Sequence, residues 1–341
     1  MTTNLFDFFK RVLIVIGVAV TPVLIWYLFG VVLMAFGAII LAMLLCLGSH
    51  PIERWLRLPR WTALTVSGLI IFVVIAGTAY LFGTQISSEF QDVVQRTTAA
   101  SSDIEKNLQG TPTGRFLLQH MSSGNFSLTD VLPGLVRTST TFMEAVIIMI
   151  ICGVYLAAQP RLYRTGVIWL FPTRHHARAA EIYDGIGEAL RLWLLGQLFE
   201  MFVIGLLTTF TIWLIGVPSP LALGLIAGIG EFIPYLGPIL AGIPAVLVAL
   251  TKSPELALWT LLAYLVIHQI EGNMVSPLIQ RRMVAIPPAV MLLGIVAITY
   301  LFGAVAIIFA APMAVVIFAA VNLIYVRDTL HEKTALTKKI S

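Results

Sequence analysis

Charged residues are scarce in this 341-residue chain, where Asp, Glu, Lys and Arg together make up 11% of the sequence. Soluble domains carry roughly 25%. Hydrophobic residues account for 59%, and the mean hydropathy is +0.95. This composition excludes an ordinary soluble domain. The formal charge of +4 is too small to indicate a nucleic-acid-binding surface, so no nucleic-acid partner is expected.

The chain also has few cysteines and lacks common catalytic motifs. The two cysteines, Cys46 and Cys152, both fall inside apolar runs, where a free cysteine behaves as a small hydrophobic residue. Neither a disulfide framework nor metal-ligand spacing is present. The chain contains no G-x-S-x-G, H-E-x-x-H or G-x-x-x-x-G-K-[ST] motif. We therefore expect neither an enzyme nor a bound cofactor or metal.

Long apolar runs dominate what is present. They cover residues 12–47, 63–82, 142–158, 192–215, 221–250, 256–270 and 289–326. About 20 apolar residues are needed for a helix to cross a bilayer, and these runs are continuous rather than alternating, which excludes a barrel. The sequence predicts an all-α, polytopic bundle in the bacterial inner membrane. Lys10 and Arg11 precede the first run without a cleavage site, which favours an uncleaved helix.

The distribution of basic residues predicts the topology. Sixteen Lys and Arg lie in the termini and in the loops on the same side, whereas five lie on the other side: Arg96, Lys106, Arg115, Arg137 and Lys252. The positive-inside rule then puts both termini in the cytoplasm. The expected parts are transmembrane helices (1–83), an extracytoplasmic helical segment (84–141), a transmembrane helix (142–158), a cytoplasmic amphipathic segment with Thr173 as a helix cap (159–192), a C-terminal core (193–327) and a cytoplasmic tail (328–341).

The C-terminal core contains two Gly- and Pro-rich segments. In the first, short apolar arms flank the sequence from Glu231 to Pro238, which suits a hairpin whose tip lies deep in the protein. Pro238 would occupy the first turn of the returning helix, where its missing N–H costs nothing.

The second segment, residues 286–320, repeats the theme. Pro220 and Pro244 are 24 residues apart, as are Pro288 and Pro312. Two interpretations stay open, an internal repeat or two unrelated hairpins, and each hairpin is either re-entrant or spanning.

Four acidic residues, Glu144, Glu200, Glu231 and Glu271, fall inside or at the edge of apolar runs. An ionisable group in the membrane is costly unless it is paired, hydrated or neutralised. Glu144 suits a boundary position, while the other three are expected to share a polar pathway. Interhelical hydrogen bonds that only fix packing are the alternative. The candidate path residues are Gln197, Glu200, Glu231, Pro234, Tyr235, Gly237, Pro238, Gln269, Glu271 and Asn273.

Three motifs carry a resemblance to a known family. They are Gly196-Gln197, then Phe232-Ile-Pro-Tyr-Leu-Gly-Pro238 with Gly242-Ile-Pro244, and Glu271-Gly-Asn-Met-Val-Ser-Pro277. Together they resemble the autoinducer-2 exporter family of bacterial permeases over nearly the whole chain. The resemblance implies a homo-oligomeric, pentameric transporter that exports autoinducer-2 or exchanges sodium or lithium for protons.

The leading hypothesis is a secondary exporter of a small polar organic molecule, with autoinducer-2 as the candidate. A carboxyl group deprived of water favours its neutral form, which suits coupling to protons. The alternatives are a Na⁺(Li⁺)/H⁺ antiporter and a non-transporting structural or regulatory assembly. Membrane lipid, a small polar solute or a monovalent cation and proton, and further copies of the chain are the expected partners.

The topology can be tested by cysteine labelling in a background without Cys46 and Cys152. We expect a membrane-impermeant maleimide to label Ser102→Cys in intact cells, and Thr337→Cys only after lysis, because of the basic asymmetry. Labelling of Thr337→Cys alone in intact cells would invert the topology.

Overall fold

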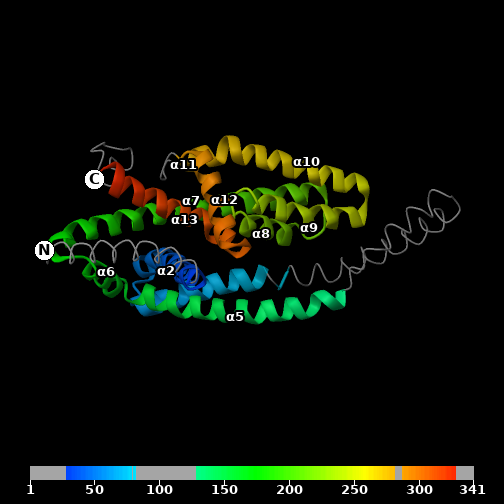
Figure 1. The fold of residues 1–341 in the computed structure, drawn as a ribbon. Helices are drawn as coiled ribbons and strands as arrows, with labels where there is room; N and C mark the ends of the chain where they lie inside the picture. The colour runs from blue at the N-terminus through cyan, green and yellow to red at the C-terminus, as the bar shows by residue number, and fades with distance from the viewer. Residues whose placement is uncertain (1–27, 79, 82–127, 281–285, 328–341) are drawn as a thin grey trace. The chain divides into compact units, whose positions relative to one another are not determined.

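The computed structural model describes residues 28–78, 80–81, 128–280 and 286–327, and these are helical without a single strand (Figure 1). The all-α prediction is therefore confirmed. Four described helices are long and apolar enough to cross a membrane: Phe29–Leu56, Arg60–Thr78, Thr173–Ile215 and Ile307–Val326. A fifth span is possible if the bent pair Met143–Ala158 and Pro160–Trp169 is counted. The expected helix before Gly30 and most of segment 84–141 lie outside the described residues.

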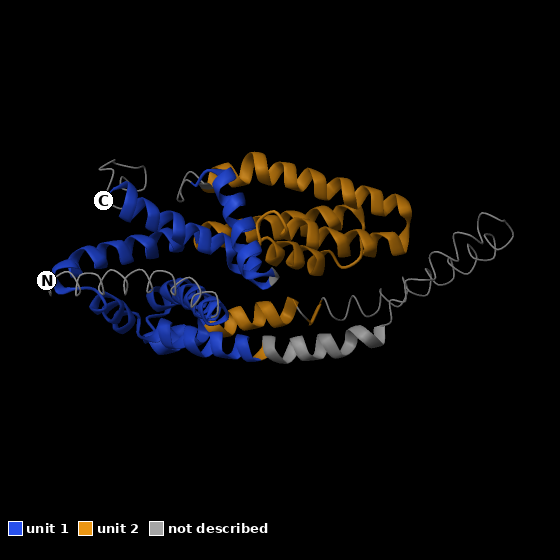
Figure 2. Cartoon of the chain, viewed as in Figure 1, with its two compact units in different colours: residues 1–67, 144–193, 284–341 blue, residues 68–143, 194–283 orange. Residues whose placement is uncertain are grey.

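The chain divides into two compact units (Figure 2). Unit 1 comprises Met1–Ser67, Glu144–Trp193 and Val284–Ser341, and unit 2 comprises Gly68–Met143 and Leu194–Met283. The long helix α7 (His176–Ile215) contributes its first half to unit 1 and its second half to unit 2.

Unit 1 packs α2 (Phe29–Leu56) against the end of α5 (Leu128–Ala158) and against α13 (Ile307–Val321). Gly37 permits this approach, because a Cβ atom there would overlap the side chain of Met149 and press on Phe309. A small residue at such a crossing lets membrane helices pack closely without a hydrophobic driving force.

Two boundaries in unit 1 differ from the sequence predictions. Helix α2 continues through Pro51 to Leu56 instead of ending at residue 47, and Arg54 lies in its last turn, where a cation complements the helix dipole. The predicted cap at Thr173 is wrong: the short 3₁₀ helix Thr173–His175 starts there after Pro172, and no side chain caps it.

Unit 2 is built around the expected hairpin. Helix α8 (Pro220–Gly230) and helix α9 (Gly237–Lys252) lie side by side, and α10 (Pro254–Ile270) packs on α9 (Figure 1). The five-residue π-helix Glu271–Val275 and the short α11 (Ser276–Gln280) follow.

The second Gly- and Pro-rich segment also forms a hairpin, made of α12 (Pro288–Phe302) and α13 in unit 1. In each hairpin a proline starts the first helix, Pro220 or Pro288, and another lies inside the second helix, Pro244 or Pro312. The equal proline spacing therefore has a counterpart in the local structure of both hairpins.

Helix α8 packs on α7 through small residues. A Cβ atom on Gly224 would overlap Thr209 Oγ1 and lie 2.7 Å from the Gly205 carbonyl oxygen, and one on Gly228 would lie 2.7 Å from the Met201 carbonyl oxygen. Because backbone atoms make these contacts, no side-chain movement alone could relieve the clash.

Replacing Gly224 by alanine should therefore destabilise the protein. We expect Gly224→Ala to cost about 1–3 kcal/mol, the usual range for overpacking, and to lower the midpoint of thermal unfolding in detergent. Gly187→Ala is the matched control, since a Cβ atom there meets nothing within 4 Å. Equal midpoints for the two variants would show that the close α7–α8 contact is not needed.

Candidate functional site

Three carboxyl groups converge inside unit 2. Glu200 comes from α7, Glu231 lies at the end of α8, and Glu271 begins the π-helix. Glu231 interacts electrostatically with both of the others, and the Glu271 carboxyl lies within its hydrogen-bonding reach. Glu231 is only 2% exposed. We call these three residues the carboxyl cluster.

Gln197 ties the hairpin to α7. Its amide Nε2 donates a hydrogen bond of 2.8 Å to the main-chain carbonyl oxygen of Glu231, and the side chain is almost fully buried. The last carbonyl groups of a helix have no partner within the helix. Gln197 supplies one from the neighbouring helix, one turn before Glu200 on the same face of α7.

The tip of the hairpin is shaped by its backbone. Tyr235 has a φ of 69°, which is uncommon for a residue other than glycine. A Cβ atom on Gly237 would overlap the Gly230 carbonyl group, so only glycine lets the two helix ends approach this closely. Pro238 stands in the first turn of α9, as predicted. Pro234 belongs to the same turn, and Tyr235 is half exposed, in contrast to the buried Glu231.

Two polar partners of the cluster flank the π-helix. Ser276 follows its last residue and donates a hydrogen bond of 2.6 Å from Oγ to Glu200 Oε1. His268 lies three residues before Glu271, with 2.7 Å between its Nδ1 and Glu271 Oε2. π-Helical turns of this kind are rare and occur often at functional sites.

Neither His268 nor Ser276 is among the predicted path residues. The signal for His268 was its i, i+3 spacing to Glu271, which puts both on one helix face. Ser276 contacts a residue 76 positions away in sequence, and no local pattern could have revealed that pairing.

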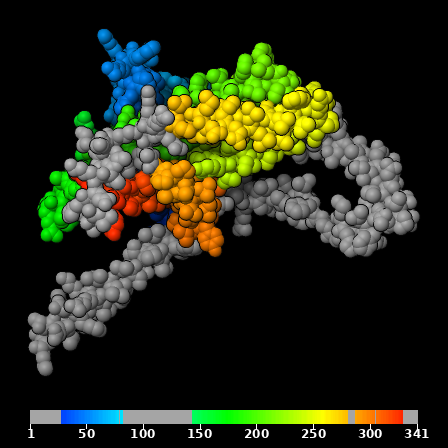
Figure 3. Space-filling model, turned by 90° about the horizontal axis from the view of Figure 1, so that it is seen from above, coloured from blue at the N-terminus to red at the C-terminus, as the bar shows by residue number. Residues whose placement is uncertain are grey.

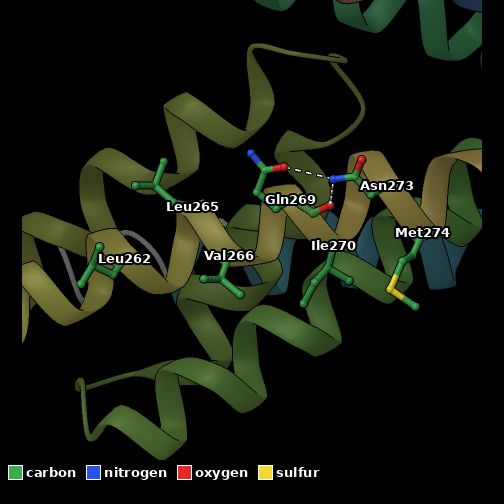
Figure 4. Close-up of a pocket in the computed structure, with 7 residues that line it drawn as sticks. All are labelled: Leu262, Leu265, Val266, Gln269, Ile270, Asn273 and Met274. Carbon is green, nitrogen blue, oxygen red and sulfur yellow. Dashed lines mark hydrogen bonds between the residues drawn. The ribbon is translucent and has the colours of Figure 1, made fainter.

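Gln269 and Asn273 lie apart from the cluster, on the exposed face of α10 and the π-helix. The Asn273 amide Nδ2 donates to the Gln269 carbonyl oxygen at 2.8 Å and to its Oε1 at 3.0 Å. The pair lines a shallow groove with apolar neighbours (Figure 4): Leu262, Leu265, Val266, Ile270 and Met274. In the space-filling view α10, in yellow, runs along the surface (Figure 3). The structure therefore separates two predicted path residues, Gln269 and Asn273, from the three acidic ones.

In the described part of the chain, no Lys or Arg forms an ion pair with the carboxyl cluster. Lys252 is the only Lys or Arg between residues 194 and 280, and it is exposed at the end of α9. Arg281 and Arg282 of the same unit lie outside the described residues. Among the described residues, Glu231 Oε2 is buried without a hydrogen-bond partner, and so is Nε2 of His268. Two carboxylates offer only acceptors, so carboxyl groups within hydrogen-bonding reach need a proton between them. A proton or a small cation would neutralise such a site.

The described part of the chain has no group of three or more His, Cys, Asp and Glu side chains placed to hold a metal ion. The cluster offers carboxylate and hydroxyl oxygens instead. Oxygen donors of this kind suit hard cations and protons rather than soft metals.

Comparison with known proteins identifies the chain's relatives. The family model described as AI-2E family transporter matches residues 13–325. YrrI of Bacillus subtilis, named as a transport protein, is 31% identical over 143 residues, which cover 42% of this chain and 40% of YrrI. YueF of the same species, also named as a transport protein, is 24% identical over 72% of each chain. A protein of Mycobacterium tuberculosis with the same description is 25% identical over 76% of this chain and 74% of its own length.

The Gln197 contact can be tested by truncation. Gln197→Ala would leave the buried Glu231 carbonyl group without its partner, which typically costs about 1–3 kcal/mol. We expect a lower unfolding midpoint in detergent and faster hydrogen exchange at residues 230–237. Gln269→Ala, at an exposed position, should change neither. Unchanged exchange in Gln197→Ala would mean that the tip does not depend on α7.

Proposed function

The chain belongs to the AI-2E transporter family, and we propose that it is a secondary transporter in which the carboxyl cluster exchanges a proton for a monovalent cation. The observation that carries this proposal is the Glu231 carboxyl, 2% exposed and next to two further carboxyl groups. Among the described residues, no Lys or Arg forms an ion pair with these carboxyl groups. A proton or a cation bound at the site would neutralise it.

The chemistry of the cluster suits competition between a proton and a cation. With a proton shared between Glu231 and Glu271, the pair carries one negative charge less and tolerates burial. A sodium or lithium ion could replace that proton, using carboxylate oxygens and Ser276 Oγ as ligands, because hard cations prefer oxygen. His268, in contact with Glu271 Oε2, offers a route by which the displaced proton leaves.

The backbone around the cluster supports a conformational cycle. The hairpin tip and the π-helix both interrupt regular α-helix beside the carboxyl groups. In transporters, discontinuous helices of this kind form ion sites, and their movement opens the site to alternate sides. Coupling to an ion gradient also agrees with a sequence that carries no phosphate-binding motif.

Export of a small polar organic molecule, with autoinducer-2 as the family-based candidate, is the second candidate function. The Gln269–Asn273 pair favours it, because this amide pair provides hydrogen-bonding groups in an otherwise apolar groove. In that case the cluster would couple proton movement to export of the solute rather than to cation exchange.

The remaining proposals concern the membrane location and the oligomeric state of the protein. A multi-pass position in the bacterial inner membrane with both termini in the cytoplasm is supported by the basic asymmetry. Assembly into a homo-oligomer, a pentamer by family resemblance, is supported by the exposed Gln269–Asn273 pair, since polar groups on a lipid-facing surface favour contacts with another helix.

Proteoliposomes test the role of the cluster. A proton gradient is imposed across the vesicle membrane, sodium is added, and an internal pH dye follows the proton flux. We expect the wild type to dissipate the gradient on addition of sodium or lithium but not of choline. Glu231→Gln and Glu271→Gln keep the size of the side chain but remove the charge, and should reduce the flux to that of empty vesicles.

Glu255→Gln is the matched control, because Glu255 is an exposed acid in the first turn of α10. It should transport as the wild type does. Wild-type flux in both cluster variants, with unchanged thermal stability, would remove the cluster from the mechanism. Sodium-independent flux that appears only with an added polar solute would favour the exporter.

A further inference from the structure

Several polar contacts in unit 1 lie together near the ends of its apolar helical segments, at what we call one level of the unit. The main-chain carbonyl oxygen of Ala157, at the end of α5, accepts hydrogen bonds from Arg60 at 3.1 Å and from Cys46 Sγ at 3.9 Å. Arg60 begins the next apolar helix, Arg60–Thr78. A small cavity at the same level is lined by residues of α2 and α7: Met43, Cys46, Leu47, His50, Gly187, Glu188 and Arg191.

Helix α6 (Pro160–Trp169) leaves this level at 92° to the apolar end of α5. A helix that is perpendicular to a membrane-spanning helix, and begins where that helix ends, runs along the membrane surface. Two hydrogen bonds fix it there: Arg164 Nε donates to Asp184 Oδ1 at 2.7 Å, and Arg164 Nη2 donates to Asp184 Oδ2 at 2.6 Å. Such a bidentate pair sets the orientation of α6 against α7.

The surface of α6 and the turn after it is strongly apolar. Ile168 is the only buried residue of α6. Large side chains stay exposed on the same stretch: Leu162 by 61%, Trp169 by 73%, Leu170 by 83% and Phe171 by 50%. Aromatic residues, and tryptophan above all, concentrate at the depth of the lipid headgroups.

The same stretch is basic and free of acids. No Asp or Glu occurs between residues 145 and 180, whereas Arg161 and Arg174 flank the apolar side chains. Both are exposed, and in the described part of the chain neither forms an ion pair. Arg164 already forms an ion pair with Asp184. Arg161 and Arg174 are therefore the basic groups available to an outside anion.

We propose that residues 160–174 form a binding surface for anionic phospholipid. The apolar and aromatic side chains enter the boundary between headgroups and acyl chains, as the apolar face of an interfacial helix does. Arg161 and Arg174 bind the phosphate groups of the same lipids, because basic groups at the membrane surface attract anionic headgroups. This surface belongs to unit 1 and is independent of the carboxyl cluster.

Tryptophan quenching in nanodiscs tests this proposal on the full chain. Brominated phosphatidylglycerol or brominated phosphatidylcholine is added at equal mole fraction to a phosphatidylcholine bilayer. The Trp169 signal is the difference between the wild type and Trp169→Phe. We expect the anionic lipid to quench this signal more strongly than the neutral lipid, and high salt to weaken that preference, because salt screens the attraction.

Charge variants identify the groups responsible. The double variant Arg161→Gln/Arg174→Gln should lose the preference for phosphatidylglycerol, whereas Arg161→Lys/Arg174→Lys should retain it. Lys252→Gln removes one exposed positive charge far from α6 in sequence and should also retain it. Equal quenching by the two lipids in the wild type, or a preference that survives in the Gln double variant, would overturn the proposal. Absence of quenching by either lipid would show that protein covers this surface.

Discussion

The burial of Glu231 without a cationic partner in the described part of the chain is the constraint on which the rest of unit 2 depends. A carboxylate shielded from water is stable only if a proton, a cation or hydrogen-bond donors compensate for it. The structure supplies a donor for Glu200 in Ser276 and places His268 Nδ1 against Glu271, but leaves one oxygen of Glu231 unpaired in the described part of the chain. A proton or a bound cation is a further means of compensation, which agrees with the proposed role of this site in transport.

The same constraint explains the irregular backbone. Non-helical backbone at membrane depth is tolerated where protein groups satisfy it. At the hairpin tip, Gln197 satisfies the Glu231 carbonyl group, and the close approach of Gly230 to Gly237 leaves no room for a side chain. Across the tip, Tyr235 takes a left-handed conformation. These features hold a buried carboxyl group at the end of helix α8.

Much of this arrangement could be predicted from sequence. The spacing of proline and glycine predicted the hairpin, and the four acidic residues in apolar runs include the three residues of the cluster. It was harder to predict which polar residues between Gln269 and Asn273 lie at the cluster. Residues two apart on an α-helix point about 200° apart, so helical periodicity places Glu271 on a different face from Gln269 and Asn273. Periodicity does not say which of these faces is buried. The Glu200–Ser276 contact depends on the π-helix and on packing between distant segments, and no local pattern encodes it.

Infrared difference spectroscopy tests the central claim most directly, because protonated and ionised carboxyl groups absorb at different frequencies. Spectra of the reconstituted protein are recorded in choline buffer and after exchange into sodium buffer. The account predicts that sodium removes a protonated-carboxyl band and that this difference is absent in Glu231→Gln. A wild-type spectrum without any sodium-dependent carboxyl band, or the same band in Glu231→Gln, would contradict a cation-exchanging cluster centred on Glu231.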